Sequence, residues 1–204
     1  MTYTIGIIIF SVIAGILMAV FSIPFWFFVV TILIIGLIRL AYIFFILYYI
    51  QNPKLIQGYL KSNKRHTLYA YALTLPNGSK SEQIQAIDKI LAKYPSPLMQ
   101  ATYGANRAIL QMDFEAAKKA IEPIKDQPLG QYTLALIQAF QGNQNDANSF
   151  RLSKKWMKPL IEAVLAFQDG DRIRYEEFRE EALKHARGIQ HYTIYHFFLR
   201  IGEQ

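Results

Sequence analysis

The chain has 204 residues, of which 52% are hydrophobic and 18% are charged. This composition excludes intrinsic disorder, which requires low hydrophobicity and many charges. The absence of cysteine excludes disulfide scaffolds, iron–sulfur clusters and cysteine-based zinc sites. The net charge of +7 is concentrated in the first part of the chain, because no acidic residue precedes Glu82. A nucleic-acid binder usually spreads its basic residues over a folded face, so nucleic acid is not an expected partner.

Residues 5–50 form an apolar segment whose only charged side chain is Arg39. The segment is more than twice as long as the ~20 residues that cross a bilayer core. Pro24 interrupts it between aromatic residues, which are typical of a membrane–water interface. The pattern predicts a transmembrane hairpin over residues 1–51, with helices at about 4–21 and about 24–50. The alternative is a buried hairpin in a soluble protein, but the other residues could not cover it.

Four basic residues directly follow the second predicted membrane helix: Lys54, Lys61, Lys64 and Arg65. The positive-inside rule places this end in the cytoplasm, and a hairpin then places both termini there. We therefore expect a multi-pass protein of the cell membrane. Its basic juxtamembrane segment, residues 52–80, should contact the anionic lipid headgroups of the inner leaflet. A cleaved signal peptide is not expected, because no charged side chain precedes the apolar segment.

Two features of the predicted hairpin are candidates for helix packing. Ser11, Gly15 and Ala19 recur every four residues, a spacing of small residues that lets helices approach closely in lipid, and Gly36 could face them. This stripe packs either within the hairpin or against another membrane subunit. In the second case the protein would be part of an oligomer or of a membrane complex. Arg39 is costly in lipid, so it either extends to the cytoplasmic headgroups or pairs with an acid of a partner helix.

The remainder of the chain has apolar residues at helical spacing and no alternating strand pattern, so the fold class is predicted to be all-α. Breaks that contain Pro, Gly, Asn or Asp divide it into eight or nine expected helices joined by short turns. Ser79 and Glu82 have the spacing of a capping box that opens one of them. The aromatic segment Ile189–Ile201 is expected to cap the core or to dock onto a partner.

Three similar segments end in Ala86, Ala117 and Ala147, which are 31 and 30 residues apart. The best unit, Tyr103–Pro128, contains Asp113, Phe114 and Ala117. This arrangement resembles the tetratricopeptide repeat, in which a Gly-Asp/Asn-aromatic-x-x-Ala turn joins two antiparallel helices. The signature Trp and Leu-Gly of that family are missing, so a generic helical bundle is the alternative.

The resemblance implies that residues 81–204 form a cytoplasmic helical-repeat domain that binds a protein or peptide on its concave side. Asn106 and Tyr132 are then the residues expected to face the concavity. The resulting function is that of a membrane-anchored scaffold or adaptor. The alternative is an accessory or assembly subunit of a larger membrane complex, acting through the hairpin residues Ser11, Gly15, Ala19 and Arg39.

No catalytic motif is found. The 11 glycines are too widely spaced for a phosphate-binding loop, and the four histidines include no HExxH pair. Acidic and basic residues alternate between Arg172 and Lys184, as on a solvated helix face. We predict that the protein is not an enzyme and has no catalytic, metal-binding or cofactor-binding residues.

Overall fold

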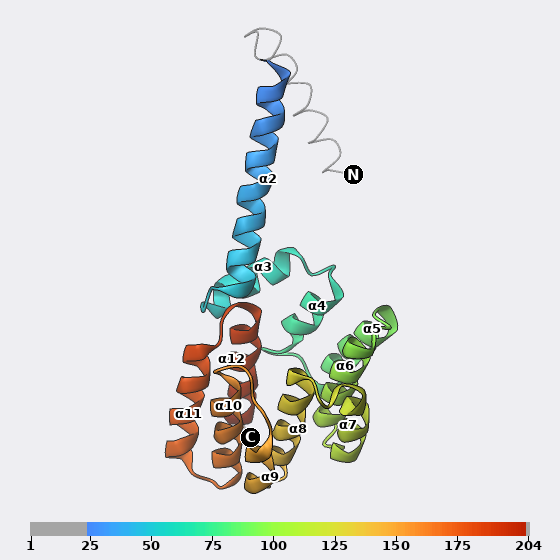
Figure 1. The fold of residues 1–204 in the computed structure, drawn as a ribbon, viewed down its shortest axis with the longest axis vertical. Coiled ribbons are helices and arrows are strands. Elements are labelled where there is room, and N and C mark those ends of the chain that lie inside the picture. The colour runs from blue at the N-terminus through green and yellow to red at the C-terminus, as the bar shows by residue number, and fades with distance from the viewer. Residues whose placement is uncertain (1–23, 203–204) are drawn as a thin grey trace. The chain divides into compact units, whose positions relative to one another are not determined.

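The computed structural model describes residues 24–202, except for the side chain of Phe25. Over these residues the fold is all-α, as predicted, with eleven α-helices, one 3-10 helix and no strand (Figure 1). The helices are α2 (Phe25–Tyr48), α3 (Pro53–Ser62), α4 (Thr67–Thr74), α5 (Lys80–Lys93), α6 (Pro97–Leu110), α7 (Phe114–Ile121), η1 (Glu122–Ile124), α8 (Pro128–Phe140), α9 (Gln144–Ser149), α10 (Met157–Gln168), α11 (Arg172–His185) and α12 (Gly188–Gly202). Ten α-helices follow Gln51 where eight or nine were expected.

The chain divides into two compact units, one that ends at Phe45 and one that begins at Ile46. The described part of the first unit is most of α2, so the second apolar segment is helical, over Phe25–Tyr48 where about 24–50 was expected. Residues Trp26–Tyr48 are long and apolar enough to cross a membrane, and almost none of their side chains are buried. The first predicted helix, with Ser11, Gly15 and Ala19, lies outside the described residues. The described chain therefore has one candidate span near the N-terminus, and a two-helix hairpin is not shown.

The second unit contains three helix–turn–helix units that share one turn geometry: α6–α7, α8–α9 and α10–α11. Each turn has one residue with positive φ, and these are Met112 (61°), Gly142 (72°) and Gly170 (73°). The next residue is always Asp or Asn, and its backbone N–H donates to a carbonyl five residues earlier, over 2.9–3.0 Å. Two of these residues, Asp113 and Asp171, also cap the following helix with their carboxylates. The repeated turns are thus 30 and 28 residues apart.

Small residues recur where the paired helices cross. Ala105, Ala135 and Ala163, each seven residues before a turn, are fully buried. On the second helices Ala117 and Ala147 are also fully buried, four residues after their caps. The predicted alignment is therefore correct for these two alanines, while the tetratricopeptide resemblance itself stays a prediction.

The alignment of Ala86 with Ala117 and Ala147 is wrong by three residues. The predicted capping box is confirmed, since Ser79 and Glu82 cap each other's backbone at the start of α5. Counted from this cap, the position equivalent to Ala117 is Gln83, which is buried, whereas Ala86 is only half-buried. Gln83 donates from Nε2 to the Thr74 carbonyl over 3.3 Å, so a polar residue fills the position that alanine occupies in α7 and α9.

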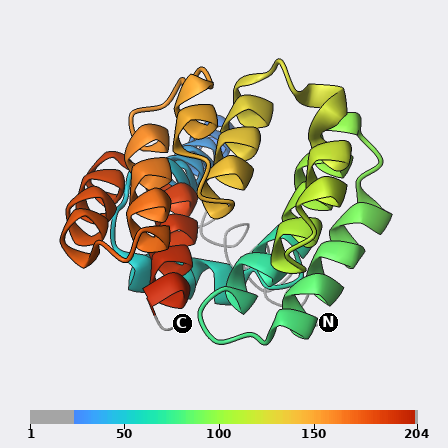
Figure 2. The same cartoon turned by 90° about the horizontal axis from the view of Figure 1, so that it is seen from below.

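The two ends of the second unit meet, so its helices follow one another around a closed curve (Figure 2). The Gln51 amide group donates hydrogen bonds of 3.0–3.1 Å to three carbonyl oxygens at the end of α11, those of Leu183, Lys184 and Ala186. The backbone N–H of Gly188 donates to the Ile50 carbonyl over 2.7 Å. These contacts, which we call the Gln51 clamp, attach the chain just after α2 to the turn between α11 and α12.

Helix α12 completes the core of this unit. Tyr192 is fully buried in a cluster with Ile46, Ile56 and Leu60, and Phe198 is buried in the main core with α10 and α11. The expectation that the aromatic segment caps the core is thereby confirmed. α12 contributes to two clusters because it packs against α3 at the beginning of the unit and against α11.

Candidate functional site

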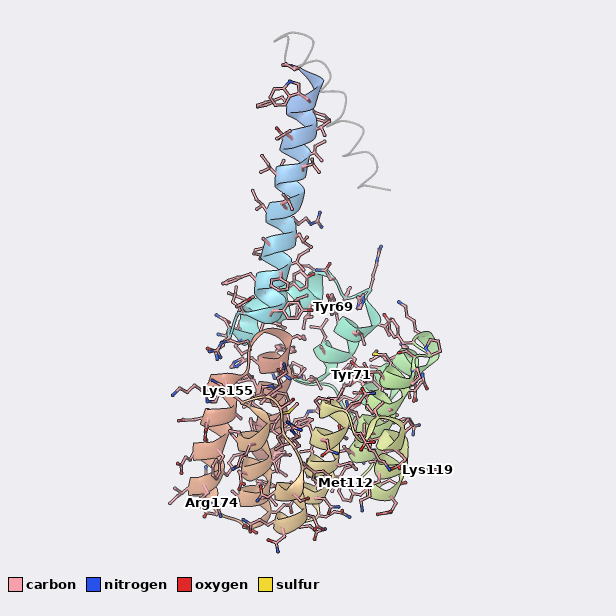
Figure 3. All side chains as sticks on the ribbon, viewed as in Figure 1. Tyr69, Tyr71, Met112, Lys119, Lys155 and Arg174 are labelled. Atoms are coloured by element: carbon pink, nitrogen blue, oxygen red, sulfur yellow. The ribbon has the colours of Figure 1, made fainter. Side chains whose placement is uncertain are left out.

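The first helices of the repeated units line a cavity of about 340 Å³. Residues of α4, α5, α6, α8, α10 and α12 surround it, and we call it the central cavity. The second helices α7, α9 and α11 contribute no lining residue, so they form the outer layer. Lys119 on α7 and Arg174 on α11 accordingly lie on opposite outer sides of this unit in Figure 3.

The two residues predicted to face a concavity, Asn106 of α6 and Tyr132 of α8, both line the central cavity. Each is half-buried. The Tyr132 ring packs edge-on against Trp156, with 5.0 Å between ring centroids. Burial raises the pKa of the Tyr132 phenol, so this residue is a neutral hydrogen-bonding group at physiological pH. Both residues therefore lie on the cavity side of their helices, while their contact with a partner stays a prediction.

A second aromatic pair joins α4 to α6. Tyr71 (labelled in Figure 3) and Tyr103 pack edge-on, with centroids 5.7 Å apart. Burial and then Tyr103 raise the pKa of Tyr71, and the nearby Arg200 guanidinium opposes this shift. His196 of α12 also lines the cavity, and burial followed by the charge of Arg200 lowers its pKa, which favours the neutral imidazole. The cavity is therefore aromatic on both sides.

Arg200 is the only Lys, Arg, Asp or Glu among the residues that line the central cavity. Its guanidinium donates to the Leu75 carbonyl over 3.1 Å from Nε and to the Gly78 carbonyl from Nη2. These bonds join α12 to the turn before α5. Both acceptors are neutral, and no described carboxylate pairs with Arg200, so its positive charge is not compensated there.

Two buried donors beside the cavity have no partner among the described residues. They are the Thr102 hydroxyl and the Trp156 indole N–H. A buried polar group without a hydrogen bond costs roughly 1–3 kcal/mol, so such groups are uncommon and call for a physical explanation. The cavity therefore combines apolar walls with hydrogen-bond donors that an acceptor group could satisfy.

The predicted lipid-contacting residues lie on one stretch of the chain. Lys54 and Lys61 are on α3, and Lys64 and Arg65 are in the turn that follows. All four are exposed, and none forms an ion pair with a described residue. In α2, Arg39 is exposed, and a Cβ added to Gly36 would meet no atom within 4 Å. Arg39 and the surface at Gly36 are therefore accessible to lipid or to another helix.

Sequence reasoning missed several residues of the central cavity, including Thr102, Trp156 and Arg200. Thr102 is one turn before Asn106 on α6, so helical spacing could have placed it on the same face. Arg200 carried no such signal, because its place in the lining depends on the contact of α12 with the turn before α5. A second cavity, of about 570 Å³, is bounded by the segment that precedes α10, by α10 and by α11. Its lining includes Lys154, Lys155, Lys158 and Glu162. It was not predicted either.

Comparisons with known proteins identify no relative: no family model matches the chain, and neither a curated protein nor a solved structure does. Within residues 24–202, no group of three His, Asp or Glu side chains is placed to hold a metal ion. The residues of the central cavity can pack against apolar groups, donate hydrogen bonds and attract a negative charge.

Proposed function

We propose that the protein is a membrane-anchored helical-repeat adaptor that binds a protein or peptide partner at the central cavity. The observation that carries this proposal is that Asn106 and Tyr132, selected from the repeat pattern, line one cavity. A concave surface built from the first helices of successive repeats is how solenoid proteins commonly present a binding face. The aromatic side chains there suit the center of a protein interface.

The anchor in this proposal is the apolar segment that ends with α2. Trp26–Tyr48 meets the length requirement for one crossing. We propose that the segment before it forms the other half of a hairpin, which places the four basic residues after α2 and the whole second unit in the cytoplasm. A reporter fused after residue 204 should then be active only on the cytoplasmic side. Activity on the opposite side would contradict this orientation.

The adaptor function is tested by placing a photo-crosslinking amino acid at single positions of the full chain in its own membrane. A crosslinker at Asn106 should produce one adduct of defined mass. The matched control is Lys119, an exposed residue of the outer helix α7, which should give no such adduct. Tyr132→Ala should remove the Asn106 adduct, because the partner loses an aromatic contact in the cavity.

Two results would overturn the adaptor proposal. One is an adduct formed equally from Asn106 and Lys119, since the partner would then not distinguish the inner from the outer helices. The other is an adduct that Tyr132→Ala leaves unchanged while the variant keeps its helical spectrum and melting temperature.

A further inference from the structure

The size of the central cavity limits what can enter it. Its volume of about 340 Å³ is near the lower end of the range of about 300–1,000 Å³ for ligand pockets. A whole helix of a partner cannot enter such a space, whereas one large side chain and its neighbouring groups can. The partner therefore reaches the cavity with a short segment.

The walls of the cavity indicate the apolar part of that segment. Tyr132 packs against Trp156 on one side, and Tyr71 packs against Tyr103 on the other. Aromatic rings prefer edge-to-face or offset contacts with further rings, and such pairs add to the effect of burial. An aromatic side chain is the group that these walls complement best.

The charge and the free donors indicate the polar part. Arg200 is the only residue of the lining with a full charge, and no described acid neutralises it. The Thr102 hydroxyl and the Trp156 N–H are buried donors without a partner. A group with a negative charge and several acceptor lone pairs satisfies both conditions, and a carboxylate has these properties.

We propose that the partner segment inserts an aromatic side chain with an adjacent carboxylate into the central cavity. The ring packs between the two aromatic pairs, and the carboxylate lies toward Arg200 and accepts hydrogen bonds from the free donors. This inference rests on the proposed adaptor function and specifies the chemistry of the partner at that same site.

The test uses the full chain in nanodiscs of zwitterionic lipid. Trp26 and Trp156 are the only tryptophans, so Trp26→Phe leaves Trp156 as a fluorescent reporter in the cavity wall. Three probes share one phenyl body: 3-phenylpropionate, its neutral amide and 3-phenylpropylamine. The carboxylate should bind at least tenfold more tightly than the amide, and the amine should bind weakest.

Three variants relate this preference to the residues. Arg200→Gln should remove the tenfold preference for the carboxylate over the amide, and Arg200→Lys should retain most of it. Thr102→Val should weaken carboxylate binding several-fold without lowering the melting temperature, because the removed hydroxyl has no partner in the free protein. Thr102→Val also covers the case in which Arg200→Gln fails to fold.

Equal binding of the carboxylate and the amide would overturn the inference and leave the adaptor proposal intact, since the aromatic wall alone would account for docking. Binding that neither Arg200→Gln nor Thr102→Val alters would also overturn it, as would binding of none of the three probes. The adaptor proposal fails separately, through the crosslinking comparison of Asn106 with Lys119.

Discussion

At the scale of single residues, Gly188 is the position where the fold most clearly depends on the absence of a side chain. Its φ is 57°, and an added Cβ would overlap the backbone carbonyl of Leu47. The backbone of Leu47 and Tyr48 at the end of α2 would have to move to make room, in addition to the cost of about 1–2 kcal/mol for an L-residue in the left-handed region. Glycine at this position therefore permits the close approach of the two ends of the second unit.

Gly188→Ala is predicted to destabilise the second unit by more than Gly170→Ala. The control has a similar φ of 73°, but a Cβ added there meets no atom within 4 Å. Gly170→Ala should therefore cost only the backbone term of about 1–2 kcal/mol. Urea denaturation followed by far-UV circular dichroism measures both free energies of unfolding. Equal losses in the two variants would show that the chain near Leu47 does not pack against Gly188.

At the scale of elements, α12 contains two histidines whose environment disfavours protonation. Burial lowers the pKa of His191 below its usual 6.5, although its Nδ1–H donates to the Leu183 carbonyl over 3.1 Å. Burial and the charge of Arg200 likewise lower the pKa of His196. In the unfolded chain both residues titrate near 6.5, so below that pH the unfolded state binds more protons than the folded state.

We predict that the stability of the second unit falls as the pH decreases through about 6.5 and is retained above it. Replacing His191 with Gln, which keeps a neutral donor, should reduce the slope of the free energy of unfolding between pH 7 and pH 5. The reference for each variant is its own stability at pH 8, where both histidines are neutral. A variant with the same slope as the parent would assign the acid sensitivity to other groups.

The start of the second unit gives a further prediction at the scale of elements. The change in composition after Gln51 suggested a boundary there, but the compact unit begins at Ile46, inside α2. Ile46 is buried against α3 and α12, and Ile50 and Gln51 form the Gln51 clamp. A fragment from Pro53 lacks all of these contacts.

A fragment from Ile46 should therefore be more stable than one from Pro53. The loss of one buried isoleucine alone corresponds to about 1.5–3 kcal/mol. The lost hydrogen bonds of the clamp would increase the difference. Thermal melts of both fragments, with equal helical content checked at low temperature, provide the comparison. Equal melting temperatures would show that the end of α2 does not contribute to the fold of this unit.

Local signals explain which elements could be predicted. The capping box at Ser79 and the turn at Asp113 depend on residues within a few positions of each other, and both were found from the sequence. Asn106 and Tyr132 were expected in the concavity from the tetratricopeptide resemblance, and both line the central cavity. The predicted alignment of Ala86 with Ala117 and Ala147 was wrong because Gln83 fills the equivalent buried position. Closure through Gln51 and Gly188 was missed because it joins distant residues that carry no local signal.

At the scale of the whole molecule, the segment after α2 presents four exposed basic residues. We predict that the fragment from Ile46 binds vesicles that contain anionic lipid and not neutral vesicles. Each basic residue near an anionic surface contributes at most about 1 kcal/mol, and salt screens this attraction. Sedimentation with vesicles should show binding that is lost at high salt and in the variant with Gln at Lys54, Lys61, Lys64 and Arg65.

The matched control replaces four exposed basic residues elsewhere in the same unit with Gln: Arg151, Lys154, Lys155 and Lys158. It has the same net charge as the first variant, so it should retain binding if the juxtamembrane positions matter. If both variants lose binding equally, net charge alone attracts the fragment. If neither anionic nor neutral vesicles bind, the four residues act only in setting topology during insertion.

The Gln51 clamp has a consequence for the order of folding during synthesis. Gln51 and Ala186 are 135 positions apart, so Gln51 leaves the ribosome long before its hydrogen-bond acceptors exist. Until then the apolar surfaces around Ile56 and Leu60 lack Tyr192, which completes their cluster. Contacts of such high sequence separation form late and leave hydrophobic surface exposed in partly made chains. A nascent chain that stops before α12 should therefore be recognised by chaperones and proteases as incomplete, although its three repeated units are already made.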